Sequence, residues 1–269
     1  MSLWSDRSFL RDVQYQTDAN LAARQSIYAY QQPPVDLTGQ MLDVALPASA
    51  DEAGVVADVG CGNGLYLAEL ARRGYGRRLI GADLSPGMLR AARQRTRGGG
   101  QLAPALLAAD AAALPLRDAS ADLTLAMHML YHVPEPEVAL RELRRVTRPG
   151  GRLVVGLNGA DHHKELRALI KEGLADVGYR GVPMVGERFD LDQGEVLLRR
   201  FFPSVARHEF RGQLVIPGPE PVASYVRSMS LAIRLGDPEA LVRAVVSRLP
   251  SGSGATFLDT TDSGCLVCT

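Results

Sequence analysis

The sequence has few of the residues that mark special classes of protein. Only three of its 269 residues are cysteine, too few for a disulfide framework, and no apolar run approaches the roughly 18 residues of a membrane span. Thirty basic residues balance thirty acidic ones, so bulk charge attracts no polyanion. We therefore expect a cytoplasmic protein without a membrane partner. Its oligomeric state stays open between monomer and homodimer.

Two short motifs could hold a metal ion, and neither is complete. Cys265 and Cys268 spell C-x-x-C, but no second pair or nearby histidine accompanies them, so we interpret them as part of a terminal strand. His162 and His163 are adjacent, point to different faces of a helix and lack a third ligand at helical spacing. The favoured interpretation there is a solvated helix start. We predict no metal site.

Apolar strands alternate with helical segments through the middle of the chain. Such alternation predicts a Rossmann-like α/β fold, a parallel sheet wound on both faces. Ser85 and Pro86 supply the N-cap and first position of one helix. The expected strands are 55–59, 78–83, 105–109, 122–127 and 152–157, and the expected helices are 65–73, 86–95 and 135–147.

The flanking regions differ in pattern from this central part. Residues 1–54 are polar and acidic and are predicted to form a helical lid. Residues 218–250 are predicted as a helical cap, inserted between the two pieces of the core, 55–217 and 251–269. Further strands are expected within 205–216, near 255–259 and near 264–268.

The strongest chemical signal is the run VVADVGCGNG at residues 55–64. A strand enters a glycine cluster and a helix follows at once, which lets a ligand approach the backbone and the free N–H groups of the helix. The nicotinamide fingerprint needs G-x-G-x-x-G, whereas here the third glycine, Gly64, comes one residue early. Asp58, two residues before the first glycine, favours a cationic ligand over a pyrophosphate.

The D-x-G-x-G-x-G pattern resembles motif I of the class I S-adenosylmethionine-dependent methyltransferases. Further matches follow in order: GADLS at 81–85, ADA at 109–111, DLTLAM at 122–127, MLYHV at 129–133 and LRRVTRPGG at 143–151. Together they cover roughly residues 55–157. Within the family, the chain looks most like the broad ubiquinone-biosynthesis-like group that acts on small molecules.

The resemblance implies a seven-stranded sheet whose last strand is antiparallel. It also implies S-adenosyl-L-methionine as methyl donor and S-adenosyl-L-homocysteine as product. Asp83 would bind the ribose hydroxyls, Asp110 and the Ala111 N–H the adenine, and Arg24 or Tyr15 the methionine carboxylate. The complete set of candidate donor-binding residues is Asp58, Gly60, Cys61, Gly62, Gly64, Asp83, Leu84, Asp110, Ala111, Met127, Tyr15 and Arg24.

The candidate catalytic residues lie in the loop after the fourth strand. Methyl transfer is an in-line displacement that often needs a general base. His128 and His132 flank Tyr131 there and titrate in the useful range. Alternatively, they orient the backbone or cap the next helix. His132 is the preferred base, because the segment around Met127 and His128 is expected nearer the donor.

Three functions stay open on the sequence. The leading one is methyl transfer to O, N or C of a small-molecule acceptor in natural-product biosynthesis. The second is methylation of an RNA base of the rRNA guanine type. It is supported by eight arginines at 72–97 and by a faint similarity of residues 159–172 to guanine-modifying rRNA enzymes. A nucleic acid partner is disfavoured, since no aromatic residues interleave with those arginines. The third is a non-catalytic protein that binds S-adenosylmethionine.

Overall fold

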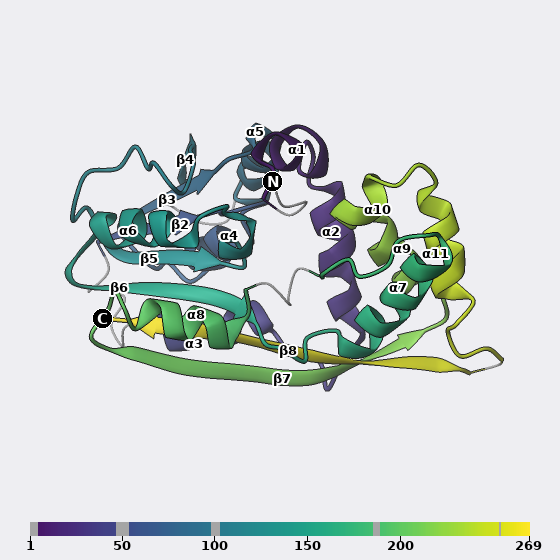
Figure 1. Ribbon diagram of the computed structural model, residues 1–269. Helices are drawn as coiled ribbons and strands as arrows, with labels where there is room; N and C mark the ends of the chain where they lie inside the picture. Colours follow the sequence, from purple (N-terminus) through teal and green to yellow (C-terminus); the bar gives the residue numbers. More distant parts are fainter. Residues whose placement is uncertain (1–4, 47–53, 98–102, 185–188, 253) are drawn as a thin grey trace.

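The computed structural model describes residues 5–46, 54–97, 103–184, 189–252 and 254–269 (Figure 1). Residues 1–4 and 47–53 of the predicted lid lie outside the described residues, as does residue 253 of the last core segment.

Eight strands form one sheet in the order β1-β7-β8-β6-β5-β2-β3-β4. Five strands run parallel: β2 (Val55–Val59), β3 (Arg78–Asp83), β4 (Ala105–Ala108), β5 (Ala121–Met127) and β6 (Thr147–Asn158). Next to β6 lies β8 (Thr256–Cys268), antiparallel to it and to β7 (Val205–Pro217). The predicted parallel core and antiparallel last strand are therefore confirmed.

Two details of the predicted sheet are wrong. The sheet has an eighth strand, β1 (Gln31–Gln32), because the end of the N-terminal segment pairs antiparallel with β7. The strands expected near 255–259 and 264–268 are one continuous strand, β8, whose register with β7 runs unbroken from Thr256 to Cys268. Cys265 and Cys268 lie buried on this terminal strand with free thiols, as interpreted from the sequence.

Helices cover both faces of the sheet. On one face α3 (Leu37–Ala45) and α4 (Leu65–Arg72) bury Met41, Leu42, Leu67 and Leu70 against the strands. On the other face α6 (Pro136–Val146) and α8 (Leu191–Leu198) bury their own apolar residues against the strands. The predicted cap of α5 (Pro86–Arg95) is confirmed, since the Ser85 hydroxyl accepts from the Gly87 and Met88 N–H groups. Apolar stripes at helical spacing thus produce the doubly wound core.

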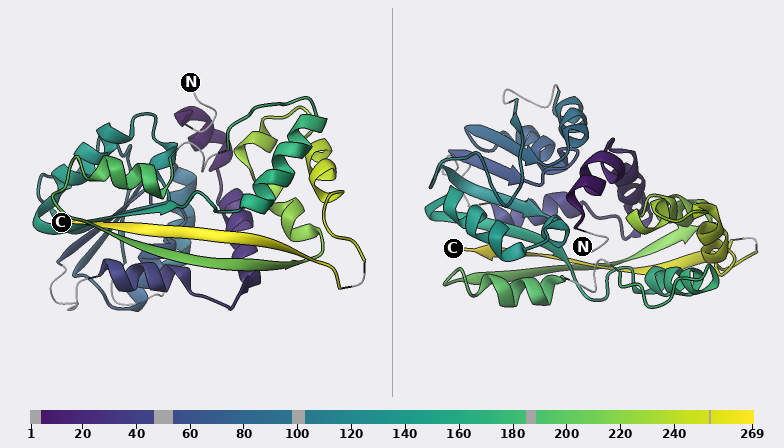
Figure 2. Two further views of the ribbon diagram at one scale, coloured as in Figure 1. Left: turned by 60° about the horizontal axis from the view of Figure 1, so that its bottom comes forward. Right: turned by 45° about the horizontal axis from the view of Figure 1, so that its top comes forward.

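A second, helical core is built on the far ends of β7 and β8, which project beyond the parallel strands (Figures 1 and 2). Leu214 and Ile216 of β7 belong to it, with helices from three parts of the chain. These helices are the 3-10 turn η2 (Ile27–Tyr30), α7 (Lys164–Asp176), α9 (Glu220–Arg227), α10 (Ser230–Ile233) and α11 (Pro238–Val246), and α2 (Ala19–Ser26) packs against α9. The N-terminal α1 (Arg7–Phe9) and the π-helical turn η1 (Leu10–Gln14) lie between the two cores. No described helix is long and apolar enough to cross a membrane.

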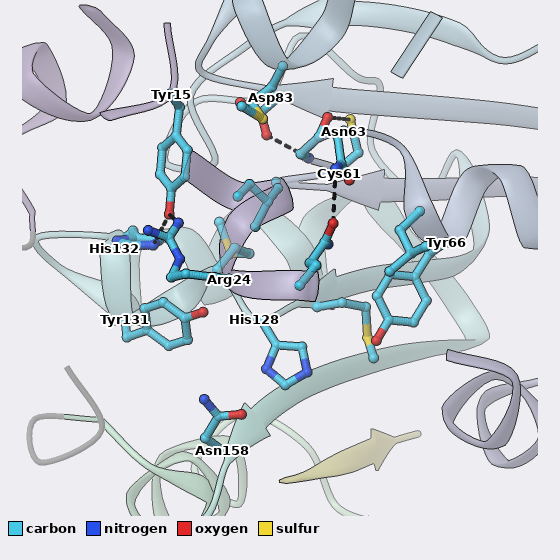
Figure 3. A pocket seen from close by; sticks show the side chains of 18 of the residues that line it. Tyr15, Arg24, Cys61, Asn63, Tyr66, Asp83, His128, Tyr131, His132 and Asn158 are labelled. Carbon is cyan, nitrogen blue, oxygen red and sulfur yellow. Dashed lines mark hydrogen bonds between the residues drawn. The ribbon is translucent and has the colours of Figure 1, made fainter. Parts of the chain in front are cut away.

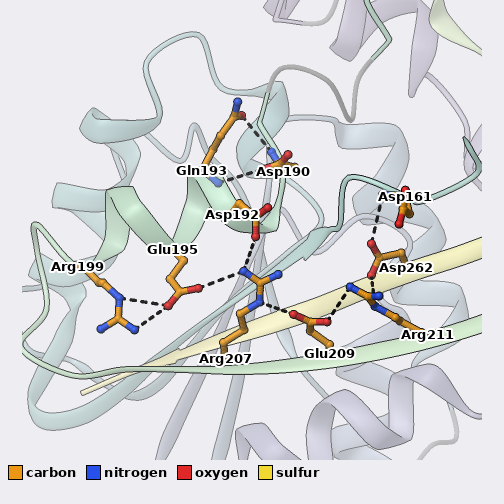
Figure 4. A network of polar contacts seen from close by, with 10 residues as sticks. All are labelled: Asp161, Asp190, Asp192, Gln193, Glu195, Arg199, Arg207, Glu209, Arg211 and Asp262. Atoms are coloured by element: carbon orange, nitrogen blue, oxygen red, sulfur yellow. Dashed lines mark hydrogen bonds and ion pairs between the residues drawn. The ribbon is translucent and has the colours of Figure 1, made fainter.

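A network of ion pairs ties α8 to the long strand β7 (Figure 4). The Arg207 guanidinium pairs with Asp192 and Glu195 of α8 and with Glu209 on its own strand. Arg211 extends the network from Glu209 towards β8. Most of these side chains are exposed, so each pair contributes little by itself, and the network mainly fixes where α8 lies on the strand.

Candidate active site

A glycine-rich turn joins β2 to α4 at the carboxyl edge of the parallel strands. Gly60, Gly62 and Gly64 have φ values of 69°, 53° and 76°, a region that glycine enters without strain. A Cβ at Gly64 would lie 2.9 Å from the Cα and Cβ atoms of Ala92, so this glycine allows α4 and α5 to pack closely. Gly60 and Gly62 line the central cavity and Gly64 does not, although a donor contact was predicted for all three.

Asp58 points an unpaired carboxyl group into the site. Its side chain is 1% exposed, and neither oxygen has a hydrogen-bond partner among the described residues. Burial, and to a lesser degree the neighbouring Asp83, raise the pKa of Asp58 to about 7. An unpaired buried acid is costly unless a ligand satisfies it. A ligand ammonium group, such as the amino group of S-adenosylmethionine, fits this position.

Asp83 lies at the end of β3, where the chain turns towards α5. Its Oδ2 accepts from the Gly62 N–H at 2.8 Å and its Oδ1 from the Ser85 N–H at 2.8 Å. Burial raises the pKa of Asp83, while these two bonds act to lower it. Each oxygen keeps a lone pair for a ligand hydroxyl, so the carboxylate can serve the predicted ribose position.

Asp110 follows β4 and lines the same cavity. Its Oδ1 accepts from the Ala112 N–H at 2.9 Å, and its Oδ2 pairs with Arg7 of α1 at 2.9 Å. The sequence indicated Asp110 but not Arg7, because an ion pair across 103 positions leaves no local pattern. The N-terminal segment thus contacts the position predicted for the adenine.

Three predicted residues form a hydrogen-bonded chain across the N-terminal segment. Arg24 Nη2 donates to the Tyr15 hydroxyl at 3.1 Å, and that hydroxyl lies 3.0 Å from Nε2 of His132 (Figure 3). Arg24 Nη1 donates to the Ser228 carbonyl at 2.7 Å. The guanidinium can only donate, so the Tyr15 oxygen accepts from Arg24, while the direction of its bond to His132 depends on the tautomer of the imidazole. The chain joins α2, η1 and α9 to the loop after β5.

The other two candidate catalytic residues lie on the same loop. His128 has a φ of 55°, unusual for a residue with a Cβ, and burial lowers the pKa of its imidazole to about 4. Its ring makes no hydrogen bond to any described residue and faces the cavity near Asn158 (Figure 3). Tyr131 stacks edge-on against His132 with ring centroids 4.6 Å apart, and burial raises its pKa.

The predicted solvated helix start at His162 and His163 is wrong. The two side chains are buried, at 6% and 3% exposure, and both line the cavity. The carboxylate of Asp259 on β8 binds His163, and the Tyr28 hydroxyl lies against both rings. Sequence spacing concealed this cluster, since its members come from segments 96 and 135 positions apart. No group of three metal-ligating side chains occurs among the described residues.

These groups surround one cavity of about 770 Å³ between the two cores. Every residue predicted to bind the donor lines it except Gly64, and so do the three candidate catalytic residues. The sequence did not assign the other polar and aromatic lining residues to the site, because their partners lie far away along the chain. Among them are Gln25, Tyr28, Asn63, Tyr66, Asn158, His162, His163 and Tyr225.

Comparison with known proteins agrees with this geometry. Residues 57–155 match the family model described as a methyltransferase domain. The malonyl-[acyl-carrier protein] O-methyltransferase of Laribacter hongkongensis is 36% identical over 155 residues, which are 55% of this chain and 50% of that protein. The methyltransferase GfsG of Streptomyces halstedii is 42% identical over 101 residues, or 37% of this chain and 36% of GfsG.

Solved structures share the fold. A putative methyltransferase from Bacillus halodurans superposes with a TM-score of 0.61 at 16% identity, covering 87% of this chain and 98% of that one. Residues 57–155 therefore form a methyltransferase domain, and the solved structure shows the same fold over most of the chain. The chain spans between about a third and a half of the length of the curated relatives it matches.

Proposed function

We propose that this protein transfers the methyl group of S-adenosylmethionine to a small-molecule acceptor by in-line displacement. The observation that carries the proposal is the cavity, where an unpaired acid, Asp58, and an aromatic lining meet between the two cores. Its volume is typical of small-molecule sites. When bound, S-adenosylmethionine supplies an activated methyl group. The protein then has to align the acceptor with that methyl group, exclude water and remove a proton from the acceptor.

The donor would be held at the edge formed by β2, β3 and β4. Asp58 would pair with its amino group, Asp83 with its ribose and Asp110 with its adenine. Arg24 makes no ion pair among the described residues, so its charge is available to the methionine carboxylate. Cys61, Leu84, Ala111 and Met127 would complete the apolar walls.

The acceptor would occupy the opposite part of the cavity, towards the helical core. His128, Tyr131 and His132 line the boundary between the two parts. Residues of the N-terminal segment and of α9 and α10 also line the cavity, including Leu10, Tyr225 and Ser230. Such a cover would exclude water from the reaction.

We propose a natural-product intermediate as the acceptor, which is in keeping with the similarity to GfsG and the enclosed, partly aromatic cavity. The competing RNA-base function requires basic surface, whereas Arg72 and Arg73 of the arginine-rich stretch are already paired with Glu69 on α4. Non-catalytic donor binding is the third alternative.

One experiment separates these functions. Purified protein is incubated with radiolabelled S-adenosylmethionine and either a small-molecule extract or total RNA. Label in the small-molecule fraction supports the proposal, label in RNA supports the second function, and donor binding without transfer to either supports the third. RNA binding that weakens steeply with salt would also speak for the second function.

A further inference from the structure

A second polar cluster lies in the helical half of the cavity, away from the candidate base His132. The Tyr28 hydroxyl on η2 lies 2.9 Å from Nε2 of His162 and 3.4 Å from Nε2 of His163. The two imidazoles precede α7, and their ring centroids are 4.1 Å apart. Tyr28 and both histidines line the cavity, so a ligand can reach the cluster.

Backbone hydrogen bonding fixes the tautomer of His162. The Asp262 N–H donates to Nδ1 of His162 at 3.1 Å, so this nitrogen carries no proton. Burial, and after it the neighbouring His163, hold the pKa of His162 well below its usual range. The ring is therefore neutral at pH 7 and carries its proton on Nε2, which donates to the Tyr28 oxygen.

Asp259 fixes the tautomer of His163 in the opposite sense. Its Oδ2 lies 2.5 Å from Nδ1 of His163, and its Oδ1 accepts from the Leu166 N–H at 3.0 Å. A fully buried carboxylate can only accept, so the His163 proton is on Nδ1. The Nε2 lone pair of His163 then receives the Tyr28 O–H.

His163 is also held in an unusual backbone conformation. Its φ is 54°, in the left-handed region, and its N–H donates to the Thr260 carbonyl at 2.7 Å. Such conformations in residues with a Cβ cost free energy and concentrate at functional sites. Here the conformation places the ring between Asp259 and Tyr28.

The Tyr28 oxygen has one hydrogen-bonding position left. It accepts from His162 and donates to His163, and a phenol oxygen has a second lone pair. Among the described residues no further donor to this oxygen is present. A ligand hydroxyl in the cavity would fill the position.

We propose that the acceptor is a hydroxyl compound whose proton passes through Tyr28 to His163, an inference that rests on the proposed methyl transfer. The acceptor O–H bond breaks as its proton moves to the Tyr28 oxygen, and the Tyr28 proton moves to Nε2 of His163. The acceptor oxygen forms a bond to the methyl carbon while the carbon–sulfur bond breaks, leaving a neutral thioether. His163 ends as an imidazolium paired with Asp259, which acts as a positioning residue.

The carboxylate behind His163 suits this residue as the final proton acceptor. The group behind His163 is a carboxylate, which stabilises an imidazolium. His132 and Tyr15 would then serve the donor side of the cavity.

The first test is nuclear magnetic resonance of protein with ¹⁵N-labelled histidine. We expect Nδ1 of His163 and Nε2 of His162 to carry the protons, and we expect Asp259→Asn to alter the His163 signals and leave the His208 signals unchanged. His208 lies on β7 outside the cavity and is the internal control. A neutral His163 with its proton on Nε2 would overturn the inference.

The second test measures transfer from radiolabelled S-adenosylmethionine to a phenol, an aliphatic alcohol and the matching aniline and alkylamine. We expect the hydroxyl compounds to be methylated, and Tyr28→Phe and His163→Gln to lower kcat about 10²–10⁴-fold with little change in the KM of the donor. Asp259→Asn should lower kcat, and Asp259→Glu should restore part of it. Tyr30→Phe on the same turn is the matched control and should leave kcat unchanged.

The outcomes separate the two proposals. Methylation of the amines only, or normal kcat in both Tyr28→Phe and His163→Gln, would overturn the inference and leave methyl transfer intact. If the wild-type protein methylates none of these compounds and no small molecule of an extract, methyl transfer itself fails. The resonance test then still decides whether the tautomers of His162 and His163 are as inferred.

Discussion

The Tyr15 hydroxyl lies 3.0 Å from Nε2 of His132, and this contact joins the N-terminal segment to the loop after β5. Arg24 donates to the same hydroxyl and also to the Ser228 carbonyl before α10. One phenol oxygen therefore links the parallel core to both parts of the cover.

Removing this hydroxyl should loosen the cover. In Tyr15→Phe, His132 and Arg24 each lose a partner in a part-buried site, so we expect S-adenosylhomocysteine to bind about 1–3 kcal/mol more weakly. Isothermal titration calorimetry measures the change. Tyr179→Phe, an exposed tyrosine outside the cavity, is the control. Equal affinity in Tyr15→Phe and the wild type would show that the contact doesn't support the donor site.

Asp83→Ala should weaken binding of S-adenosylhomocysteine by about 1–3 kcal/mol, because a charged acceptor for the ribose hydroxyls is lost. The same calorimetric titration gives the affinity. Glu172→Ala removes an exposed acid on α7 and should change nothing. Unchanged affinity in Asp83→Ala would contradict the ribose assignment.

Asp58 should make stability depend on pH. Its pKa is about 7 in the folded protein and near 3.8 when unfolded, so between about pH 4 and 7 the unfolded chain binds fewer protons. The free energy of unfolding therefore falls as pH rises through this window. In Asp58→Asn this fall should shrink, and the variant should be more stable than wild type at pH 8, by on the order of 1–4 kcal/mol.

Urea unfolding at pH 5 and pH 8 measures this difference in both proteins. The same variant should bind S-adenosylhomocysteine more weakly, since the partner of the amino group has lost its charge. Parallel pH dependences in the variant and the wild type would refute an unpaired ionisable Asp58.

Gly64→Ala should destabilise the fold more than Gly74→Ala. Both glycines have φ near 70°, so both variants carry a similar backbone cost of about 1 kcal/mol. At Gly64 the new Cβ also meets Ala92 at 2.9 Å, whereas at Gly74 nothing lies within 4 Å. Thermal unfolding of the two variants isolates the packing cost. Equal losses of stability in the two variants would mean that close packing of α4 and α5 does not depend on Gly64.

The sequence predicted the parallel core well because each strand and helix there carries its own local pattern. It failed where polar residues are buried by distant partners. Asp259, Thr261 and Asp262 are buried in β8 and look like a break between two strands in the sequence. Asp259 pairs with His163 and Asp262 with His162, both about 100 positions earlier, and only the folded structure brings these groups together.

The candidate site also contains some residues that the sequence indicates and others that only the folded structure reveals. Asp58, Asp83 and Asp110 follow strands at one sheet edge, so strand ends indicate them directly. The Tyr28, His163 and Asp259 cluster depends on how the helical core sits on β8, which no local period encodes. His162 and His163 were assigned to solvent, because adjacent polar residues before a helix usually are.

The central claim is methyl transfer to a small hydroxyl compound, and product analysis with radiolabelled S-adenosylmethionine tests it most directly. We predict one labelled methyl group on an acceptor oxygen for each S-adenosylhomocysteine formed, with Tyr28→Phe slowing both together. Tight donor binding without label on any small molecule, or label found in RNA instead, would contradict the claim.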